Sequence, residues 1–290
     1  VRSRLFVRDG HYFPADLEAK GLVAACPPGG KALGNPLIRE TQPQKARIKG
    51  SRAVFAFEAL LDSLQKRGDA PAVIELRGDT LTVYSFATIA GQARGLACGL
   101  RAAGLADGDP VGLWAPNGAS WVIIRLAVAA AGGVAVAIDD LADAAEAAAI
   151  IRSSGLRRLF ATAAHLDELE KDAPSLEAVE RIVVDDDSAE LGSWRSLLAD
   201  RGSAALPSLS ADAATMLVYT SGTTGRPKPF VLRNRHVEAN VRAIGEFGLI
   251  GTGDRVLLPL PLHHVYPFVV GLLTPLSVGG TVVFPEAASG

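Results

Sequence analysis

The chain has 290 residues, 49% hydrophobic and 21% charged, a composition typical of a globular protein rather than a disordered or fibrous one. Its 29 basic and 31 acidic residues leave a net charge of −2, which argues against a nucleic-acid partner, because such proteins usually carry a strong basic excess. The two longest apolar runs are interrupted before the roughly 20 residues that a membrane helix needs, and the N-terminus lacks the apolar core of a signal peptide, so we expect a cytoplasmic protein without a membrane span.

The first 52 residues differ from the rest of the chain. They are rich in Pro, Gly and cations and show no sustained hydrophobic period. We therefore predict an irregular N-terminal extension over residues 1–52.

From Val54 onward, the hydrophobic pattern becomes regular. A helix is predicted up to Gly68, followed by two short strands around "RGD", and Ser85 is placed to N-cap the next long helix. Strands and helices then largely alternate along the chain. The predicted strands are "PVGLWA", "VAVAI", "RRLFA", "TMLVY", "RVLLPL" and "TVVF". The predicted helices are "SWVIIRLAVAAAG", "DAAEAAAIIRSSG", "NRHVEANVRAIGEFG" and "PFVVGLLTPLSVG".

The predicted strands are continuously apolar rather than alternating. This pattern is typical of a mostly parallel sheet, or sheets, covered by helices on both faces, and so of an α/β fold. Small and polar residues over 199–214 mark the best internal boundary. We predict a first α/β subdomain over 53–205 and the start of a second over 206–290.

The segment "YTSGTTGRPKPF", Tyr219 to Phe230, carries the clearest chemical signal. Its glycines allow successive backbone N–H groups to converge on an anion, its hydroxyls add short-range donors, and Lys228 adds a mobile positive charge. It is not the common P-loop, because Lys228 neither follows the second glycine directly nor precedes a hydroxyl residue. A solvated Ser/Thr/Gly linker is the alternative.

This segment resembles the phosphate-binding signature of the adenylate-forming, or AMP-binding, enzymes. The superfamily includes acyl-CoA synthetases, the adenylation domains of peptide synthetases, and luciferases. Further segments from Val54 to Phe284 resemble the N-terminal part of these enzymes in the same order: "LTVYSF", "GLADGDPVGLWAPNGASWVI", "AAAGGVAVAID" and "LPLHHVYPFVVGLLTPLSVGGTVVF".

The resemblance implies an ATP-dependent ligase that converts a carboxylic acid to an acyl-adenylate and then transfers the acyl group to a thiol of coenzyme A or a carrier protein. ATP and Mg²⁺ are the implied cofactors. His264 would orient the acid, and Lys228 and His264 are the implied catalytic residues. Apolar residues such as Val265, Tyr266 and Phe268 suggest a slot for a fatty or aryl acid. The residues implied to hold the phosphates are Thr220, Ser221, Gly222, Thr223, Thr224, Gly225 and Lys228.

No metal-binding residues are assigned. Adjacent residues of an extended segment point to opposite faces, so we expect His263 and His264 not to form a metal site. His264 could instead be a hydrogen-bonded interior or rim residue. We expect surface positions for His11, His165 and His236 and a solvated turn at Asp185–Asp187, with Mg²⁺ binding by these aspartates as the alternative.

The sequence also departs from the family pattern. Pro229, the Arg233–Asn234 pair and Ala137 stand where the family usually has other residues. The family's later adenine-binding, ribose-binding and catalytic-lysine segments have no counterpart, so we expect an incomplete large N-terminal domain, an absent C-terminal lid domain and no catalysis by this chain alone. Two alternatives stay open: a non-catalytic relative that acts as a nucleotide-binding or protein-interaction module, and completion of the site by a separate polypeptide.

Overall fold

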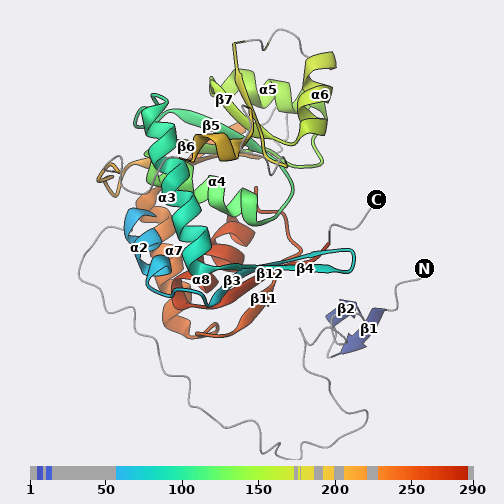
Figure 1. The fold of residues 1–290 in the computed structure, drawn as a ribbon, viewed down its shortest axis with the longest axis vertical. Helices are drawn as coiled ribbons and strands as arrows, with labels where there is room; N and C mark the ends of the chain where they lie inside the picture. The colour runs from blue at the N-terminus through green and yellow to red at the C-terminus, as the bar shows by residue number, and fades with distance from the viewer. Residues whose placement is uncertain are drawn as a thin grey trace, which may run out of the picture. The chain divides into compact units, whose positions relative to one another are not determined.

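The computed structural model (Figure 1) divides the chain into two units, Val1–Gln44 and Lys45–Gly290, and each is described by itself. The residues that it describes are 5–8, 11–14, 57–172, 176, 178–185, 192–198, 206–220 and 228–286. In the first unit, β1 (Leu5–Arg8) pairs antiparallel with β2 (His11–Pro14). This hairpin is a regular element inside the segment for which the sequence predicts only an irregular extension.

The larger sheet of the second unit contains, among the described residues, six strands in the order β10-β9-β6-β5-β7-β8. Every neighbouring pair is parallel except β9 and β10. These strands are β5 (Pro110–Trp114), β6 (Val134–Ala137), β7 (Arg158–Ala161), β8 (Glu180–Val183), β9 (Ala214–Thr220) and β10 (Lys228–Arg233). The prediction of a mostly parallel sheet is confirmed.

A smaller sheet is built, within the described ranges, from four strands in the order β11-β12-β3-β4. β11 and β12 run parallel to each other and to β3, whereas β3 and β4 form the antiparallel hairpin predicted around "RGD". The strands are β3 (Pro71–Arg77), β4 (Thr80–Ser85), β11 (Arg255–Leu257) and β12 (Thr281–Phe284).

Helices cover both faces of the larger sheet (Figure 1). Val111 and Leu113 of β5 belong to the core cluster of α3 (Phe86–Ala102) and α4 (Ala119–Ala130), whereas Trp114 belongs to the cluster of α5 (Ala144–Ser154) and α6 (Ala163–Asp172). Successive strand residues point to opposite faces, so a continuously apolar strand supplies both clusters. The predicted helix-covered architecture is confirmed.

The helix α4 lies between the two sheets and contacts β5, β6 and β3. Every residue of α4 except Ser120 is buried, which explains why its sequence is apolar on all sides. No helix in the described part of the chain combines the length and apolar character needed to cross a bilayer.

The smaller sheet shares the core cluster of α3 and α4, and its strand β12 contacts α8 (Thr274–Val278). Ser85 caps α3 as predicted, because its hydroxyl accepts a hydrogen bond from Thr88 N at 3.1 Å. The remaining helices are α2 (Phe57–Gln65), the 3₁₀ helix η2 (Trp194–Leu197), α7 (Asn234–Phe247) and the π-helix η3 (Pro267–Leu273).

The sequence does not predict β8, α6 or β10. In β10, Pro229 lacks an N–H and breaks the strand pattern, but β10 is at the edge of the described sheet, where proline is tolerated. The boundary proposed near residue 206 remains a prediction. Each of the two sheets contains strands from before and from after this boundary, because β9 pairs with β6 and β12 pairs with β3.

Candidate functional site

The carboxyl ends of the parallel strands in the larger sheet bring several polar residues to one edge. Asn117 follows β5, Asp139 and Asp140 follow β6, Thr162 follows β7, and Asp185 follows β8. In open parallel sheets this edge is where ligands usually bind. It is therefore the candidate site.

Asn117 ties this edge to the segment that follows β11 of the smaller sheet. Its side-chain Nδ2 donates to Leu260 O at 2.8 Å, and its Oδ1 accepts from Leu262 N at 2.9 Å. Arg77 adds a hydrogen bond to Asn117 O at 3.1 Å. The Leu262 side chain is fully buried. The two hydrogen bonds from Asn117 and the burial of Leu262 together fix the backbone just before His263.

His263 and His264 point toward each other, and the expectation that they lie on opposite faces is wrong. Their Nε2 atoms are 3.1 Å apart and their ring centroids 4.0 Å apart. The reason is that residues 262–264 form a turn rather than an extended segment, with His264 N donating to Pro261 O at 3.3 Å. His264 is exposed, whereas only 13% of the His263 side chain is exposed.

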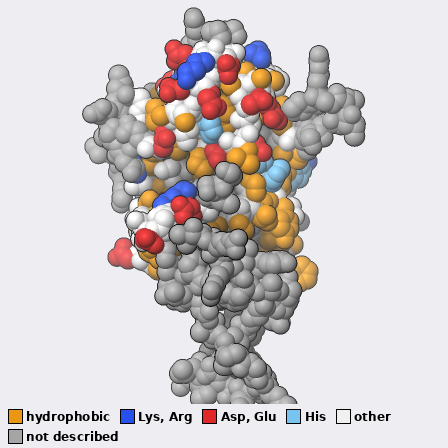
Figure 2. Space-filling view, turned by 90° about the vertical axis from the view of Figure 1, so that its right-hand side faces the viewer, with side chains coloured by type: hydrophobic (Ala, Val, Ile, Leu, Met, Phe, Trp, Pro, Cys, Tyr) orange, Lys and Arg blue, Asp and Glu red, His pale blue; other side chains and the backbone are white. Residues whose placement is uncertain are grey.

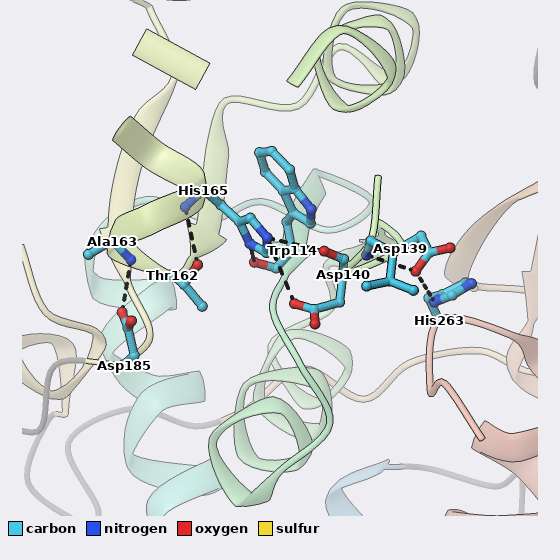
Figure 3. A network of polar contacts seen from close by, with 9 residues as sticks. Trp114, Asp139, Asp140, Thr162, Ala163, His165, Asp185 and His263 are labelled. Atoms are coloured by element: carbon cyan, nitrogen blue, oxygen red, sulfur yellow. Dashed lines mark hydrogen bonds and ion pairs between the residues drawn. The ribbon is translucent and has the colours of Figure 1, made fainter. Parts of the chain in front are cut away.

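Asp139 reaches the histidine pair from the end of β6. Figure 3 shows its carboxylate turned toward His263, with 3.6 Å between Oδ1 and Nδ1. The same Oδ1 accepts a hydrogen bond from Leu141 N at 3.1 Å, which fixes the orientation of the carboxylate. Burial lowers the pKa of His263; the Asp139 carboxylate opposes this shift, and His264 adds to it.

His165 is not the surface residue that the sequence predicts. Its ring stacks on Trp114 with centroids 4.1 Å apart and planes 2° apart (Figure 3), and 15% of its side chain is exposed. Its Nδ1 lies 3.1 Å from Trp114 O and its Nε2 3.1 Å from Asp140 O. Burial raises the pKa of the Asp140 carboxyl, and the nearby His165 opposes this shift.

Asp185 caps α6, since its Oδ1 accepts a hydrogen bond from Ala163 N at 2.9 Å. Asp185 is exposed in a bend, which agrees with the solvated turn that the sequence predicts, and this contact gives it a structural role as well. Asp186 and Asp187 lie outside the described residues. In the described ranges no three His, Cys, Asp or Glu side chains come together to hold a metal ion.

The predicted phosphate-binding segment lies between two paired strand ends. Thr220, the last residue of β9, is opposite Lys228, the first residue of β10. In the parallel pair of β6 and β9, Val136 is opposite Leu217. Asp139 and Thr220 each follow that pair by three residues, so they lie at the same edge of the sheet. Ser221, Gly222, Thr223, Thr224 and Gly225 lie outside the described residues, and their roles and that of Lys228 remain predictions.

The residues expected to line an acyl slot have different environments. Tyr266 is 68% exposed and Val265 is half-buried, whereas Phe268 is fully buried. Phe268 makes an edge contact with Trp121, with ring centroids 6.1 Å apart, and its ring lies 4.5 Å from the guanidinium carbon of Arg125. Phe268 therefore belongs to the core, and Tyr266 is the more accessible aromatic residue.

Arg125 is a fully buried cation that the sequence does not single out. Its Nη2 donates to Thr215 Oγ1 at 3.3 Å, and Phe57 and Phe268 both contact its guanidinium. Within the described residues, Nε and Nη1 have no hydrogen-bond partner, and burial lowers the pKa of Arg125 to about 9.

Figure 2 shows histidine side chains next to hydrophobic ones on one face of the described part of the chain. Three large hydrophobic side chains near the histidine pair or Asp139 in sequence are well exposed: Leu260, Tyr266 and Leu141. Exposed apolar side chains of this size suit contact with the apolar part of a ligand or with a packing partner.

Comparison with known proteins identifies the family. Residues 60–289 match the AMP-binding enzymes. The chain is 34% identical over 216 residues to the sulfoacetate–CoA ligase of Cupriavidus necator, which covers 72% of this chain and 40% of that protein. It is 31% identical over 233 residues to the L-proline–[L-prolyl-carrier protein] ligase of Pseudomonas fluorescens, which covers 79% of this chain and 45% of that protein.

The fold is similar to that of the inhibitor-bound N-terminal domain of FACL13 from Mycobacterium tuberculosis. The TM-score is 0.68 at 25% identity, over 81% of this chain and 58% of that one. The chain thus spans less than half the length of the two ligases, and its fold is that of the N-terminal part of adenylate-forming enzymes. It belongs to the AMP-binding enzyme family.

Proposed function

We propose that this chain forms part of an ATP-dependent ligase that activates a carboxylic acid. A carboxylate oxygen attacks the α-phosphorus of ATP, the bond to the β-phosphate oxygen breaks, and pyrophosphate leaves. A thiol then attacks the acyl carbon of the acyl-adenylate and AMP is released. The observation that carries the proposal is the family match over residues 60–289, which includes the sequence "TSGTTGRPK" between β9 and β10.

Thr220 to Gly225 and Lys228 would bind the β- and γ-phosphates of ATP. Backbone N–H groups and hydroxyls supply neutral donors, and the ammonium group of Lys228 supplies a positive charge. These groups stabilise the leaving pyrophosphate when their donors are in position before the reaction starts. The pairing of Thr220 with Lys228 supports this role, because it brings the two ends of the segment to the same edge of the sheet as Asp139.

His264 would contact the carboxylate of the acid. Its exposure, and its place in a turn that Asn117 fixes, support this role. The exposed Tyr266 would contact the apolar part of the acid, for which a fatty or aryl group remains our proposal.

The acyl acceptor would be coenzyme A or a carrier protein. The two ligases named above support one alternative each, because one is a CoA ligase and the other a carrier-protein ligase. Mg²⁺ would accompany ATP and offset the charge of its phosphates, and we assign no ligand for it, because the described residues contain no metal cluster. ATP and both acceptors are available in the cytoplasm, where we propose that the protein acts.

ATP–pyrophosphate exchange by the full-length protein tests this proposal. Exchange reports reversible formation of the acyl-adenylate and needs no thiol, so the unknown acceptor does not limit the assay. We expect exchange that depends on adding one class of carboxylic acid from a panel of fatty, aryl, amino and sulfonated acids. ATP binding without exchange for any acid would overturn the proposal and support the nucleotide-binding module instead.

A further inference from the structure

We propose that Asp139 and His263 are positioning residues that set the protonation state of His264, so that a carboxylate ligand binds to His264 Nδ1 together with a proton. The three groups lie in series. Asp139 Oδ1 is 3.6 Å from His263 Nδ1, and His263 Nε2 is 3.1 Å from His264 Nε2. The role of His264 in this proposal rests on the proposed function, whereas the protonation states can be tested without it.

The contact between the two rings restricts where protons can be. Two nitrogens 3.1 Å apart form a hydrogen bond only if one carries the proton and the other presents a lone pair. Because burial lowers the pKa of His263, that ring is neutral at pH 7 and carries a single N–H. The arrangement therefore depends on which nitrogen of His263 holds the proton.

The Asp139 carboxylate selects Nδ1 of His263. A carboxylate next to Nδ1 favours the tautomer that presents an N–H to it, as in other carboxylate–histidine pairs. His263 Nε2 is then the acceptor and His264 donates through its own Nε2–H. The Nδ1 of His264 is left without a proton in the free protein.

This state of His264 has a consequence for an anionic ligand. A lone pair repels a carboxylate, so binding at Nδ1 requires a proton from solvent. His264 then donates through Nδ1 to the carboxylate and through Nε2 to His263, and both bonds are charge-assisted. The KM of the acid should therefore rise as the pH is raised, because the proton that binding requires becomes scarcer.

Other charged groups near the pair do not replace Asp139. Asp140 is the adjacent carboxylate, but it faces His165, with 3.9 Å between Oδ1 and Nε2 (Figure 3). Arg77 acts on Asp140 and hydrogen-bonds to Asn117 O. Burial, Asp139 and His264 are the influences that act on the pKa of His263. Asp140 therefore offers a matched control for Asp139.

The direct test is NMR of the histidine rings in the full-length protein without ligand, in the wild type and in Asp139→Ala, Asp140→Ala and Asp139→Glu. We expect the Nδ1–H tautomer of His263 in the wild type and in Asp140→Ala. Asp139→Ala should shift it to Nε2–H, and Asp139→Glu should restore Nδ1–H. A His263 ring that holds the Nε2–H tautomer in the wild type, or that keeps Nδ1–H in Asp139→Ala, would overturn the proposal even if the protein is an active ligase.

A second readout is the pH dependence of ATP–pyrophosphate exchange with an accepted acid. In Asp139→Ala, a neutral His264 can donate through Nδ1, so the KM of the acid should lose its pH dependence. An Asp139→Ala variant with the wild-type pH profile would contradict the proposal. Absence of exchange in the wild type would refute the proposed function and with it the role of His264 in acid binding, but not the tautomer assignment.

Discussion

Asn117 and Leu262 are 145 positions apart in sequence, yet the backbone N–H of Leu262 donates to Asn117 Oδ1 at 2.9 Å. The Asn117 amide also donates to Leu260 O at 2.8 Å. One side chain on the loop after β5 therefore fixes the segment that leads into the histidine pair, and it connects the loops of the two sheets.

We expect Asn117→Ala to lower the free energy of unfolding by roughly 1–3 kcal/mol, because it removes two hydrogen bonds to backbone groups. Asn117→Asp should have an intermediate effect, since its carboxylate still accepts from Leu262 N but cannot donate to Leu260 O. Urea denaturation of both variants measures the difference. An alanine variant as stable as the wild type would show that water replaces both bonds.

The stacked His165 predicts a second effect on stability. His165→Ala removes the stacking on Trp114 and the ring nitrogens that lie within hydrogen-bond distance of the carbonyl oxygens of Trp114 and Asp140, so we expect a loss of roughly 2–3 kcal/mol. His165→Phe should lose less, because it keeps the stacked ring. Thermal unfolding ranks the variants, and equal losses in both would assign the whole effect to the hydrogen bonds.

Gly99 of α3 lies against the backbone of η2. A Cβ at this position would overlap the carbonyl oxygen of Leu197, which cannot move without moving the helix turn. We expect Gly99→Ala to destabilise the fold by roughly 1–3 kcal/mol, even though alanine is the better helix former. In the control variant Gly251→Ala, the nearest atom is Asp254 Oδ2 at 3.6 Å, so its stability should be close to that of the wild type. A stable Gly99→Ala variant would contradict the close approach of α3 and η2.

Arg125 predicts a pH dependence of stability. Burial lowers its pKa to about 9 in the folded protein, well below the ordinary value of the unfolded chain. Between these values the unfolded chain binds more protons, so the contribution of Arg125 to stability rises with pH, and below pH 9 the full cost of burying its charge is present. We expect Arg125→Met to raise the unfolding free energy at pH 7 by roughly 1–4 kcal/mol.

Urea denaturation at pH 7 and at two values above pH 9 measures this effect, and the exposed Arg152→Met on α5 serves as the control. The difference between wild type and Arg125→Met should shrink as the pH rises through 9. A loss of stability in Arg125→Met at pH 7 would show that the contacts with Phe57, Phe268 and Thr215 outweigh the cost of burial.

Much of the fold follows from local patterns in the sequence. The apolar strands β5, β6 and β7 and the Ser85 cap are recognisable because each depends on residues close to one another in the chain. The strand β10 is hidden by Pro229, and α6 by a polar sequence in which only Leu166 and Leu169 are buried. Whether such segments are regular depends on the neighbours against which they pack.

The candidate site is less predictable for the same physical reason. Lys228 and the residues from Thr220 to Gly225 form a contiguous motif that the sequence reveals directly. The contact between His263 and His264 depends on a turn held by Asn117, and the burial of His165 depends on Trp114, 51 residues away. Asn117 lies in a segment that carries the family resemblance, but its partners cannot be identified from sequence spacing.

The most direct test of the central claim is the rate of acid-dependent ATP–pyrophosphate exchange in the full-length protein and in Lys228→Ala. The ammonium group should stabilise the leaving pyrophosphate, so we expect its removal to slow exchange by roughly 100-fold. A Ser221/Thr223/Thr224 triple alanine variant should show a loss of similar size, and the exposed Lys171→Ala on α6 should exchange at the wild-type rate. Undiminished exchange in Lys228→Ala and in the triple variant would contradict the assignment of this segment as the phosphate-binding site.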